Sequence, residues 1–326
     1  METVTVNTKQ DDNDNDNNQD GALVLWKYNN PFSNYKQDPV RIFIFNGFTL
    51  NISQKLSDPI NITQNTGNIV WDGAYILSKY IADHLNLDYL SGISCRRKIR
   101  FIELGSGCGL VGLVAWLTGG YVVCTGTHED IEHTKFNIKQ NVEYVMNQQQ
   151  NQFECNKEDE DNVVESRNRI AQLDKDNIQV HILDWTSLPT TEDTTNPLHK
   201  SNVPSFDIIL ASEILYLPDL HKDLVKTIRY FNHSKSRNDQ DTCFEKEIKS
   251  KDEMKCETRV LGIYKQRGLG EEQFFKIAQV FGKLRVEWID TSWIDQPSIG
   301  SHMNQSSSTT SSTYAEYKMF WLIPDS

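Results

Sequence analysis

A strand that runs into a glycine-rich turn and then a helix constrains this chain more than any other feature. Residues 97–120 read RKIRFIELGSGCGLVGLVAWLTGG, with glycines at positions 105, 107, 109 and 112. Glycine permits positive φ and lets a ligand approach the backbone closely. A buried strand that ends in such a turn and opens a helix is typical of a nucleotide site in a doubly wound sheet. A turn without a ligand is the alternative, which the density of glycines disfavours.

The rest of the chain alternates between predicted strands and helices. Apolar runs predict strands at 98–104, 121–125, 178–183, 206–212, 259–264, 284–290 and 314–323, and helices near 109–118, 130–145, 218–231 and 270–282. This alternation predicts an α/β fold with a Rossmann-like, seven-stranded, mostly parallel sheet and helices on both faces. The last two strands have no helix between them, so we expect an antiparallel hairpin at the sheet edge.

Two more elements precede the glycine turn, and several polar segments interrupt the pattern. Residues 40–53 predict a hairpin that turns near Asn46–Gly47, and residues 69–85 predict a helix with Asp72 as its N-cap. Residues 1–20 are predicted to be a disordered tail, and residues 21–326 a single domain. Polar-biased stretches near 147–177, 190–204, 232–257 and 296–313 are predicted to be loop insertions that bury no core.

Charge and cysteine content limit the partners and the compartment. A net charge of −12 with no basic stripe argues against nucleic acid as the main partner. No apolar run is long enough for a membrane span, and the acidic N-terminus does not resemble a signal peptide. The six cysteines show neither CxxC nor metal-ligand spacing, so we expect no metal. A monomer with reduced thiols, in the cytoplasm and also the nucleus, is expected.

The details of the turn favour S-adenosyl-L-methionine over a dinucleotide. Aligning the turn to G-x-G-x-x-G places Leu110 where the third glycine should stand. Glu103 precedes the turn, where a carboxylate would repel a pyrophosphate but could hold an ammonium or stand near a sulfonium. ELGSGCG fits the E/D-x-G-x-G-x-G signature of S-adenosylmethionine sites. A nicotinamide oxidoreductase is therefore disfavoured.

Polar and aromatic residues follow two other predicted strands. Asp184 is expected to meet the adenine amino group and Trp185 to stack beside the ring. Ser212, Glu213 and Tyr216 follow the strand at 206–212, at the sheet edge where α/β proteins bind ligands. Glu213 and Tyr216 could flank a methyl-accepting amine. The alternatives are that Trp185 only packs and that Glu213 or Asp219 caps the following helix.

Five segments together resemble successive motifs of the seven-strand protein-lysine methyltransferases. They are VWDGAYILSKYI, ELGSGCGLVGLVA, LDW, ASEILY and YKQRGLGEEQFF. The resemblance covers about residues 40 to 323 apart from the insertions, and the last segment points to the branch that methylates valosin-containing protein (p97). It implies a class I methyltransferase fold and S-adenosylmethionine-dependent methyl transfer to a protein side chain, with lysine the expected acceptor. The substrate would be a p97-type ATPase, a chaperone or an elongation factor.

The resemblance also implies roles for particular residues. Those that would surround the cofactor are Trp71, Gly105, Ser106, Gly107, Trp185 and Ser212. Trp71 would line the methionine end, Trp185 would pack on the adenine, and Ser212 stands where the family usually has alanine. Glu213 and Tyr216 would correspond to the Asp-x-x-Tyr motif beside the target lysine.

Two positions depart from the family pattern. The family's usual ribose-binding aspartate falls at Gly126, so His128 or Glu129 is expected to reach the ribose instead. Glu213 replaces the motif's aspartate, which also resembles a histidine-specific protein methyltransferase. A small-molecule or histidine-specific methyltransferase, and an inactive cofactor-binding or interaction module, therefore remain alternatives.

Overall fold

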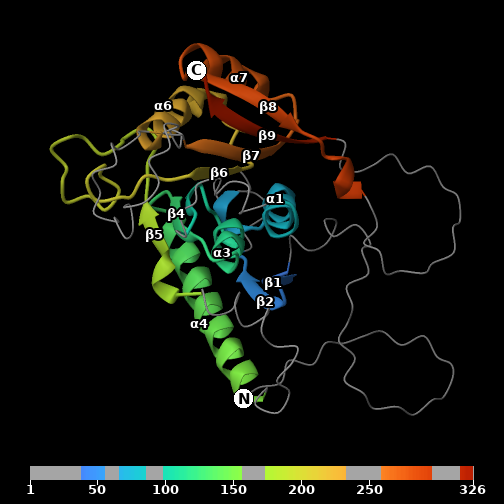
Figure 1. Cartoon of the computed structure of the whole chain (residues 1–326). Helices are drawn as coiled ribbons and strands as arrows, with labels where there is room; N and C mark the ends of the chain where they lie inside the picture. The colour runs from blue at the N-terminus through green and yellow to red at the C-terminus, as the bar shows by residue number, and fades with distance from the viewer. Residues whose placement is uncertain are drawn as a thin grey trace, which may run out of the picture.

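The computed structural model describes residues 38–55, 66–85, 98–155, 173–232, 258–295 and 316–325 (Figure 1). The predicted tail at 1–20, the insertion at 296–313 and nearly all of the insertion at 232–257 lie outside these residues. The middle of the insertion at 147–177 lies outside them as well.

A seven-stranded sheet forms the centre of the molecule. Its strands are β3 (Arg100–Leu104), β4 (Tyr121–Gly126), β5 (Ile178–Ile182), β6 (Ile208–Ser212), β7 (Arg259–Lys265), β8 (Leu284–Ile289) and β9 (Tyr317–Pro324). The strand order is β5-β4-β3-β6-β7-β9-β8. Strands β3 to β7 are parallel, and β9 runs antiparallel between β7 and β8. The predicted seven-stranded, mostly parallel sheet and its antiparallel edge are therefore confirmed.

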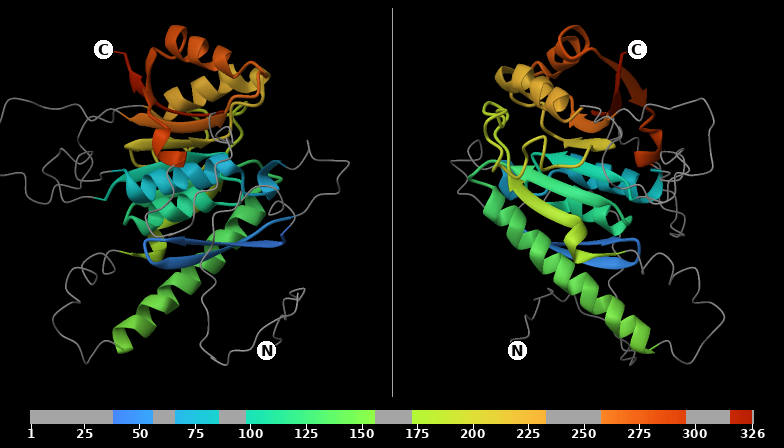
Figure 2. Two further views of the ribbon diagram at one scale, coloured as in Figure 1. Left: turned by 90° about the vertical axis from the view of Figure 1, so that its right-hand side faces the viewer. Right: turned by 60° about the vertical axis from the view of Figure 1, so that its left-hand side comes forward.

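Helices cover both faces of this sheet (Figure 2). They are α1 (Asp72–Asp83), α3 (Leu110–Leu117), α4 (Ile131–Cys155), α6 (His221–Phe231) and α7 (Glu271–Val280), with short 3₁₀ turns η2 (Thr66–Asn68), η3 (Lys175–Asn177), η4 (Pro218–Leu220) and η5 (Ser292–Asp295). Neighbouring strand residues point to opposite faces. Phe101 accordingly packs in the cluster that contains α1, α3 and α4, and Ile102 in the cluster that contains α6 and α7.

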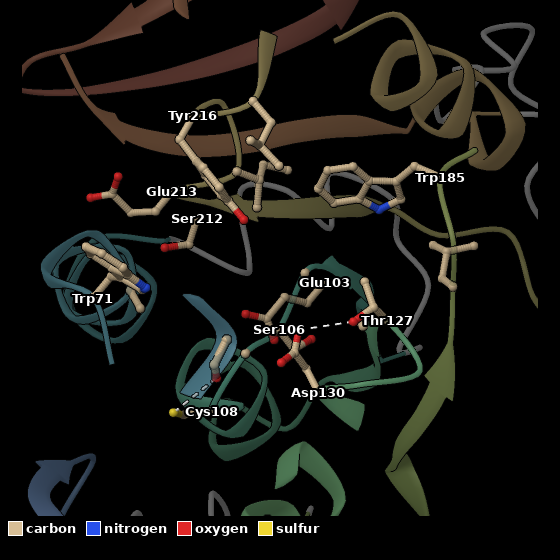
Figure 3. Close-up of a pocket in the computed structure, with 18 of the residues that line it drawn as sticks. Trp71, Glu103, Ser106, Cys108, Thr127, Asp130, Trp185, Ser212, Glu213 and Tyr216 are labelled. Carbon is tan, nitrogen blue, oxygen red and sulfur yellow. Dashed lines mark hydrogen bonds between the residues drawn. The ribbon is translucent and has the colours of Figure 1, made fainter. Parts of the chain in front are cut away.

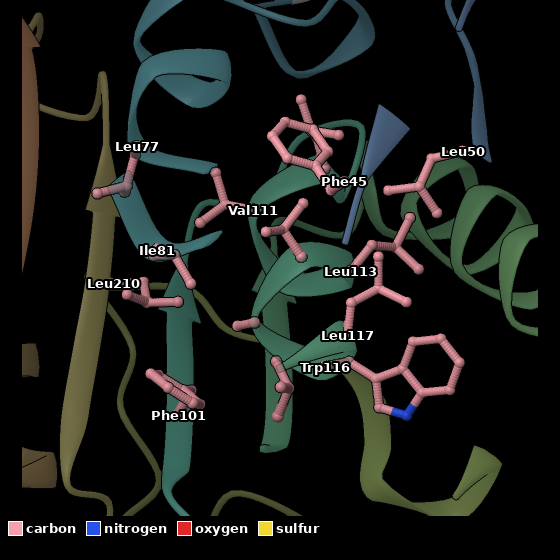
Figure 4. Close-up of a cluster of buried hydrophobic side chains, with 14 of the residues drawn as sticks. Phe45, Leu50, Leu77, Ile81, Phe101, Val111, Leu113, Trp116, Leu117 and Leu210 are labelled. Atoms are coloured by element: carbon pink, nitrogen blue, oxygen red, sulfur yellow. The ribbon is translucent and has the colours of Figure 1, made fainter. Parts of the chain in front are cut away.

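Helix α3 follows the glycine turn and is the most buried of the helices on the α1, α3 and α4 side of the sheet (Figure 4). Every one of its residues is buried, because α1, the N-terminal hairpin and α4 enclose it against the sheet. Trp116 donates its indole N–H to the carbonyl of Asp174 at 2.8 Å, which satisfies the one polar atom of that ring. The glycine turn therefore sits on a rigid support.

The predicted hairpin is confirmed as β1 (Val40–Phe45) and β2 (Phe48–Ser53). Asn46 and Gly47 have φ of 51° and 81°, as a two-residue type I′ turn requires. The hairpin forms its own two-stranded sheet. The outer edge of β2 is bound by side-chain amides of α4 rather than by another strand.

Three expectations about the elements need correction. Helix α1 begins at Asp72 with Trp71 at its N-cap position, and the Asp72 carboxylate instead accepts the Tyr317 hydroxyl at 3.1 Å. Helix α4 continues to Cys155, since the Gln- and Asn-rich stretch after residue 146 contains no proline or glycine to end it. In the segment 190–204, Leu198 and Val203 are buried in the second cluster. No helix in the described ranges has the length and apolarity of a membrane span.

Candidate functional site

A pocket lies at the carboxyl ends of β3, β4, β5 and β6, beside the start of α1 (Figure 3). All the predicted site residues except Glu129 and its alternative His128 line it. They are Trp71, Glu103, Gly105, Ser106, Gly107, Asp184, Trp185, Ser212, Glu213 and Tyr216. The sequence prediction had drawn these residues from four separate segments, and the parallel sheet brings them to one edge.

The glycine turn forms a concave backbone surface at the floor of the pocket. Gly105 and Gly107 have φ of 66° and 50°. A Cβ at Gly105 would lie 3.2 Å from Ile214 Cγ2, and one at Gly107 would lie 3.2 Å from the carbonyl oxygen of Gly67. Ser106 fixes the turn to β4, because its N–H donates to the Thr125 carbonyl at 2.7 Å. Both positions therefore favour glycine, by their backbone conformation and by their close neighbours, and glycine leaves the backbone of the turn uncovered for a ligand.

Glu103 holds this turn in place from beneath. Its side chain is 2% exposed, and its Oε2 accepts the N–H of Gly112 in the first turn of α3 at 3.0 Å. Burial raises the pKa of Glu103 to about 7, and hydrogen bonds from Ser106, Gly112 and Cys124 oppose the rise. A Cβ at Gly112 would lie 2.2 Å from Cys124 Sγ, so only glycine fits there. The Glu103 carboxylate thus holds the first turn of α3 by a hydrogen bond, and Glu103 also forms part of the pocket wall.

Trp185 and Asp184 occupy one end of the pocket. The half-buried Trp185 ring lies 3.5 Å from the Cβ position of Gly105 and faces the cavity (Figure 3). Asp184 is exposed, and its Oδ1 accepts the N–H and hydroxyl of Thr186 at 2.8 and 2.7 Å. The Asp184 side chain therefore shapes the turn that presents Trp185. Its predicted contact with an adenine amino group stays a prediction.

The loop after β6 supplies the opposite wall. Glu213 has a φ of 56°, a left-handed conformation that a non-glycine residue keeps only where its surroundings impose it. Its N–H donates to the Ile263 carbonyl at 2.9 Å, which fixes this conformation. The Tyr216 hydroxyl points toward the middle of the pocket (Figure 3). The buried Ser212 Oγ makes no hydrogen bond within the described residues.

Glu213 is ion-paired with a residue that the sequence analysis missed. Its Oε2 lies 2.8 Å from Nη1 of Arg267, and the Arg267 guanidinium lies 5.7 Å from the centre of the Trp71 ring. Burial alone would lower the pKa of Arg267, but the Glu213 carboxylate raises it overall. Oε1 of Glu213 is buried and has no hydrogen-bond partner among the described residues. Gly73 gives this side chain room, since a Cβ there would lie 2.6 Å from Glu213 Cγ.

The segment YKQRGLGEEQFF carries the arginine of this ion pair. Glu271, at the start of α7, accepts the N–H groups of Arg267 and Leu269 at 2.9 Å each and so closes the loop that carries the arginine. The only sequence signal for Arg267 was therefore the quoted segment as a whole. The alternative in which Glu213 caps the next helix is wrong, because its carboxylate binds Arg267 and α6 begins without a side-chain cap.

The end of β4 differs from the prediction by one residue. Glu129 and His128 are exposed and do not line the pocket, whereas Asp130 does. Asp130 directly precedes the first residue of α4, so its side chain turns back toward the sheet edge while Glu129 faces solvent. The Thr127 hydroxyl donates to Oδ2 of Asp130 at 3.1 Å. Gly126 also lines the pocket, without a side chain to offer.

The residues of this pocket fit S-adenosylmethionine. The turn is a cradle that a side chain would fill, and an indole stands at each end of the cavity (Figure 3). Ser212 Oγ and Glu213 Oε1 are buried oxygens without partners in the described structure, and polar ligand groups could satisfy them. Among the described residues no cluster of three or more His, Cys, Asp or Glu side chains is arranged to hold a metal ion.

Comparison with known proteins supports the same chemistry. Residues 50–159 match a family described as lysine methyltransferase. Relatives include protein N-lysine methyltransferase METTL21A of Mus musculus, 25% identical over 58% of this chain and 64% of that protein. Protein-lysine N-methyltransferase EFM2 of Saccharomyces cerevisiae is 27% identical over 56% of this chain and 38% of its own length. EEF1A lysine methyltransferase 3 of Mus musculus is 33% identical over 31% of this chain and 38% of its own length.

The chain thus spans between 38% and 64% of the length of these three relatives. None of the three names mentions p97, so that narrower resemblance stays a prediction.

Proposed function

We propose that this protein is an S-adenosylmethionine-dependent methyltransferase that modifies a lysine side chain of another protein. The observation that carries the proposal is the convergence of the glycine turn, Trp71, Trp185 and the Glu213–Tyr216 loop on one pocket. The match of residues 50–159 to the lysine methyltransferase family supports the choice of acceptor.

In this proposal the residues at the carboxyl edge of the sheet would hold the cofactor. Trp185 would stack on the adenine, the backbone of Gly105 to Gly107 would accommodate the central part, and Trp71 would line the methionine end. S-Adenosylmethionine supplies an electrophilic methyl group when it is bound. The enclosing side chains exclude water and align the acceptor, and such alignment accounts for most of the rate in a displacement of this kind.

Glu213 and Tyr216 act on the acceptor amine. A lysine arrives as an ammonium and must lose a proton before it can attack. Oε1 of Glu213, which no described residue binds, is the atom to which the ammonium would donate a hydrogen bond. Arg267 holds the other carboxylate oxygen and so fixes the direction of Oε1. Tyr216 contributes its ring face or hydroxyl beside the amine.

The substrate is proposed to be a protein. EEF1A is the substrate in the name of one relative, and all three relatives are named for lysine methylation. An elongation factor is the first candidate to assay, followed by the p97-type ATPases and chaperones that the sequence resemblance implies. We propose that the protein acts in the cytoplasm or the nucleus, a proposal that the free thiols of the buried Cys108 and Cys124 support.

The direct test is transfer of a radiolabelled methyl group to the proteins of a cell lysate. Wild-type protein is expected to label a discrete set of protein bands, and Glu213→Ala to lower that labelling by at least about a hundredfold, which corresponds to a loss of about 3 kcal/mol of transition-state stabilisation. Glu287→Ala, which removes an exposed acid from the edge strand β8, serves as the control and should label as wild type does. Unchanged labelling by Glu213→Ala would remove that residue from the mechanism.

A further inference from the structure

We infer that Asp130 binds the ribose hydroxyl groups of the cofactor, in place of the acid that is missing at Gly126. This inference rests on the proposed function, because it assumes that the pocket holds S-adenosylmethionine. It names the residue of this chain that supplies the ribose-binding carboxylate, which glycine at position 126 cannot supply.

The order of strands gives Asp130 its position. Trp185 follows β5, the glycine turn follows β3, and β4 lies between these two strands. A nucleoside whose base lies on Trp185 and whose methionine part crosses the turn must set its ribose above the end of β4. Asp130 is the carboxylate that this strand end brings into the pocket lining, and it stands in the lower part of the cavity in Figure 3.

The surroundings hold the Asp130 carboxylate in one orientation. The Thr127 hydroxyl donates to Oδ2 of Asp130. The backbone carbonyl of Asp130 accepts the N–H of His133, at the start of α4, at 3.0 Å. On the other side the carboxylate packs against Gly67, where a Cβ would lie 2.6 Å from Asp130 Cγ and 2.9 Å from each carboxylate oxygen. Glycine at position 67 is therefore a condition for this side chain to lie where it does.

A fixed carboxylate suits a ribose because a vicinal diol offers two O–H donors. Hydrogen bonds to a charged acceptor are stronger than hydrogen bonds to a neutral one. The other acids near the pocket are occupied elsewhere: Glu103 binds the first turn of α3, and Asp184 binds Thr186. Asp130 therefore has the charge, the position and the orientation that this contact requires.

The structure also shows why the acid could move away from position 126. Gly126 does not have positive φ, and a Cβ there would meet only Ile131 Cδ1, at 3.5 Å. The backbone at this position does not require glycine, so a residue with a side chain should be tolerated there. An aspartate restored at 126 should be able to take over from Asp130.

The test is calorimetric titration of S-adenosylhomocysteine and its 2′-deoxy and 3′-deoxy analogues into full-length protein. Asp130→Asn is expected to weaken binding of S-adenosylhomocysteine by about 10- to 100-fold, the equivalent of one or two charge-assisted hydrogen bonds. It should weaken binding of at least one deoxy analogue by less than about threefold, because that ligand has already lost the contact. Glu129→Gln removes the neighbouring exposed acid and should bind as wild type does.

A second part of the test measures recovery of binding affinity in a double variant instead of loss of affinity in a single one. Gly126→Asp combined with Asp130→Asn is expected to recover most of the lost affinity for S-adenosylhomocysteine. It should leave nearly unchanged the affinity for the deoxy analogue that Asp130→Asn leaves nearly unaffected. Thermal melting of each variant without ligand keeps a folding defect separate from a binding defect.

Two results would overturn the inference, and they are distinguishable. Wild-type binding with an equal loss for all three ligands in Asp130→Asn would show that Asp130 acts on the pocket's shape and not on the ribose, while the proposed function would stand. No binding by the wild-type protein would remove the proposed function and this inference together.

Discussion

At the scale of single residues, the arrangement around Glu213 has the strongest consequence. Its carboxylate is 5% exposed and shares one oxygen with Arg267, and the Tyr317 hydroxyl binds the nearby Asp72. Burial raises the pKa of Tyr317, and the Asp72 and Glu213 carboxylates raise it further. These groups combine two acids with one arginine and so favour the approach of a further cation, which a substrate lysine would supply.

Arg267→Met should expose the dependence of Glu213 on its partner. Leaving one member of a buried pair without the other is costly, and for this partly exposed arginine we expect a loss of about 1–3 kcal/mol in the free energy of unfolding. Glu213→Gln together with Arg267→Met should recover most of it, since neither charge remains. Urea unfolding of the two single variants and the double variant measures the coupling. Strictly additive losses would mean that the pair contributes nothing to stability.

Glu103 should make stability depend on pH in a direction unusual for a carboxylate. Its pKa in the folded protein is about 7 against an ordinary value of 4.5, so the folded state binds the proton more tightly than the unfolded state does. Its contribution is therefore fully present below pH 4.5 and is lost as pH rises to about 7, by up to about 3 kcal/mol.

Glu103→Gln keeps an acceptor for the Gly112 N–H and cannot ionise. Unfolding free energies of the two proteins, measured from pH 5 to pH 8, should diverge as pH rises, with the variant becoming the more stable of the two. Parallel curves would mean that Glu103 ionises normally in the folded state.

Most of the candidate site was predictable at this scale because its residues follow strand ends directly. Trp185, Ser212 and Glu213 stand within a few positions of a carboxyl strand end, and a parallel sheet must bring such positions together. Arg267 and Asp130 were missed for a different reason. Asp130 lines the pocket because α4 begins directly after it, and Arg267 turns inward because Glu213 lies opposite it. The local sequence pattern predicts neither the exact start of the helix nor the partner in another loop.

At the scale of elements, the hairpin is bound to the core by helix α4. Asn137 accepts the N–H of Ser53 at 2.9 Å and donates to the carbonyl oxygens of Ser53 and Cys108 at 3.0 Å each. Asn141 makes the same two-way contact with Asn51. Two side-chain amides thus satisfy the edge of β2 as a third strand would.

Asn137→Ala should separate the hairpin from the helix. The side chain is fully buried and makes three hydrogen bonds, so we expect a loss of about 2–4 kcal/mol in the free energy of unfolding. Hydrogen exchange should show faster exchange at the Ser53 amide. Lys139→Ala, an exposed change on the same helix, is the matched control and should change neither quantity by much. Equal behaviour of the two variants would contradict this account of the hairpin.

The sequence predicted which elements exist better than it predicted their limits and contacts. Alternation identified the hairpin and all seven strands of the sheet, because each carries an apolar face that must be buried. The same rule fails for the late part of α4, which has no apolar periodicity to extend, and for residues 190–204. There, Leu198 and Val203 are isolated apolar residues in a polar segment that tertiary packing nonetheless buries.

At the scale of the whole molecule, the sheet sorts the pocket into regions by strand order. The pocket wall carries Trp185 after β5, Asp130 after β4, the glycine turn after β3 and Glu213 after β6. Under the proposed function these would be the base, ribose, central and acceptor regions in that order. The net charge of −12 gives the molecule a field that favours a cationic, lysine-bearing partner and opposes a nucleic-acid one. Adding salt should therefore weaken the apparent affinity for a protein substrate more than the affinity for the cofactor.

The identity of the methylated residue tests the central claim most directly. Wild-type protein is incubated with a cell lysate and S-adenosylmethionine that carries a deuterated methyl group, and labelled peptides are sequenced by mass spectrometry. We predict deuterated methyl groups on lysine in a small number of proteins, with the signal absent in Glu213→Ala and present in Glu287→Ala. Deuterated methyl on histidine, on small molecules alone, or on nothing while the cofactor binds would contradict the account.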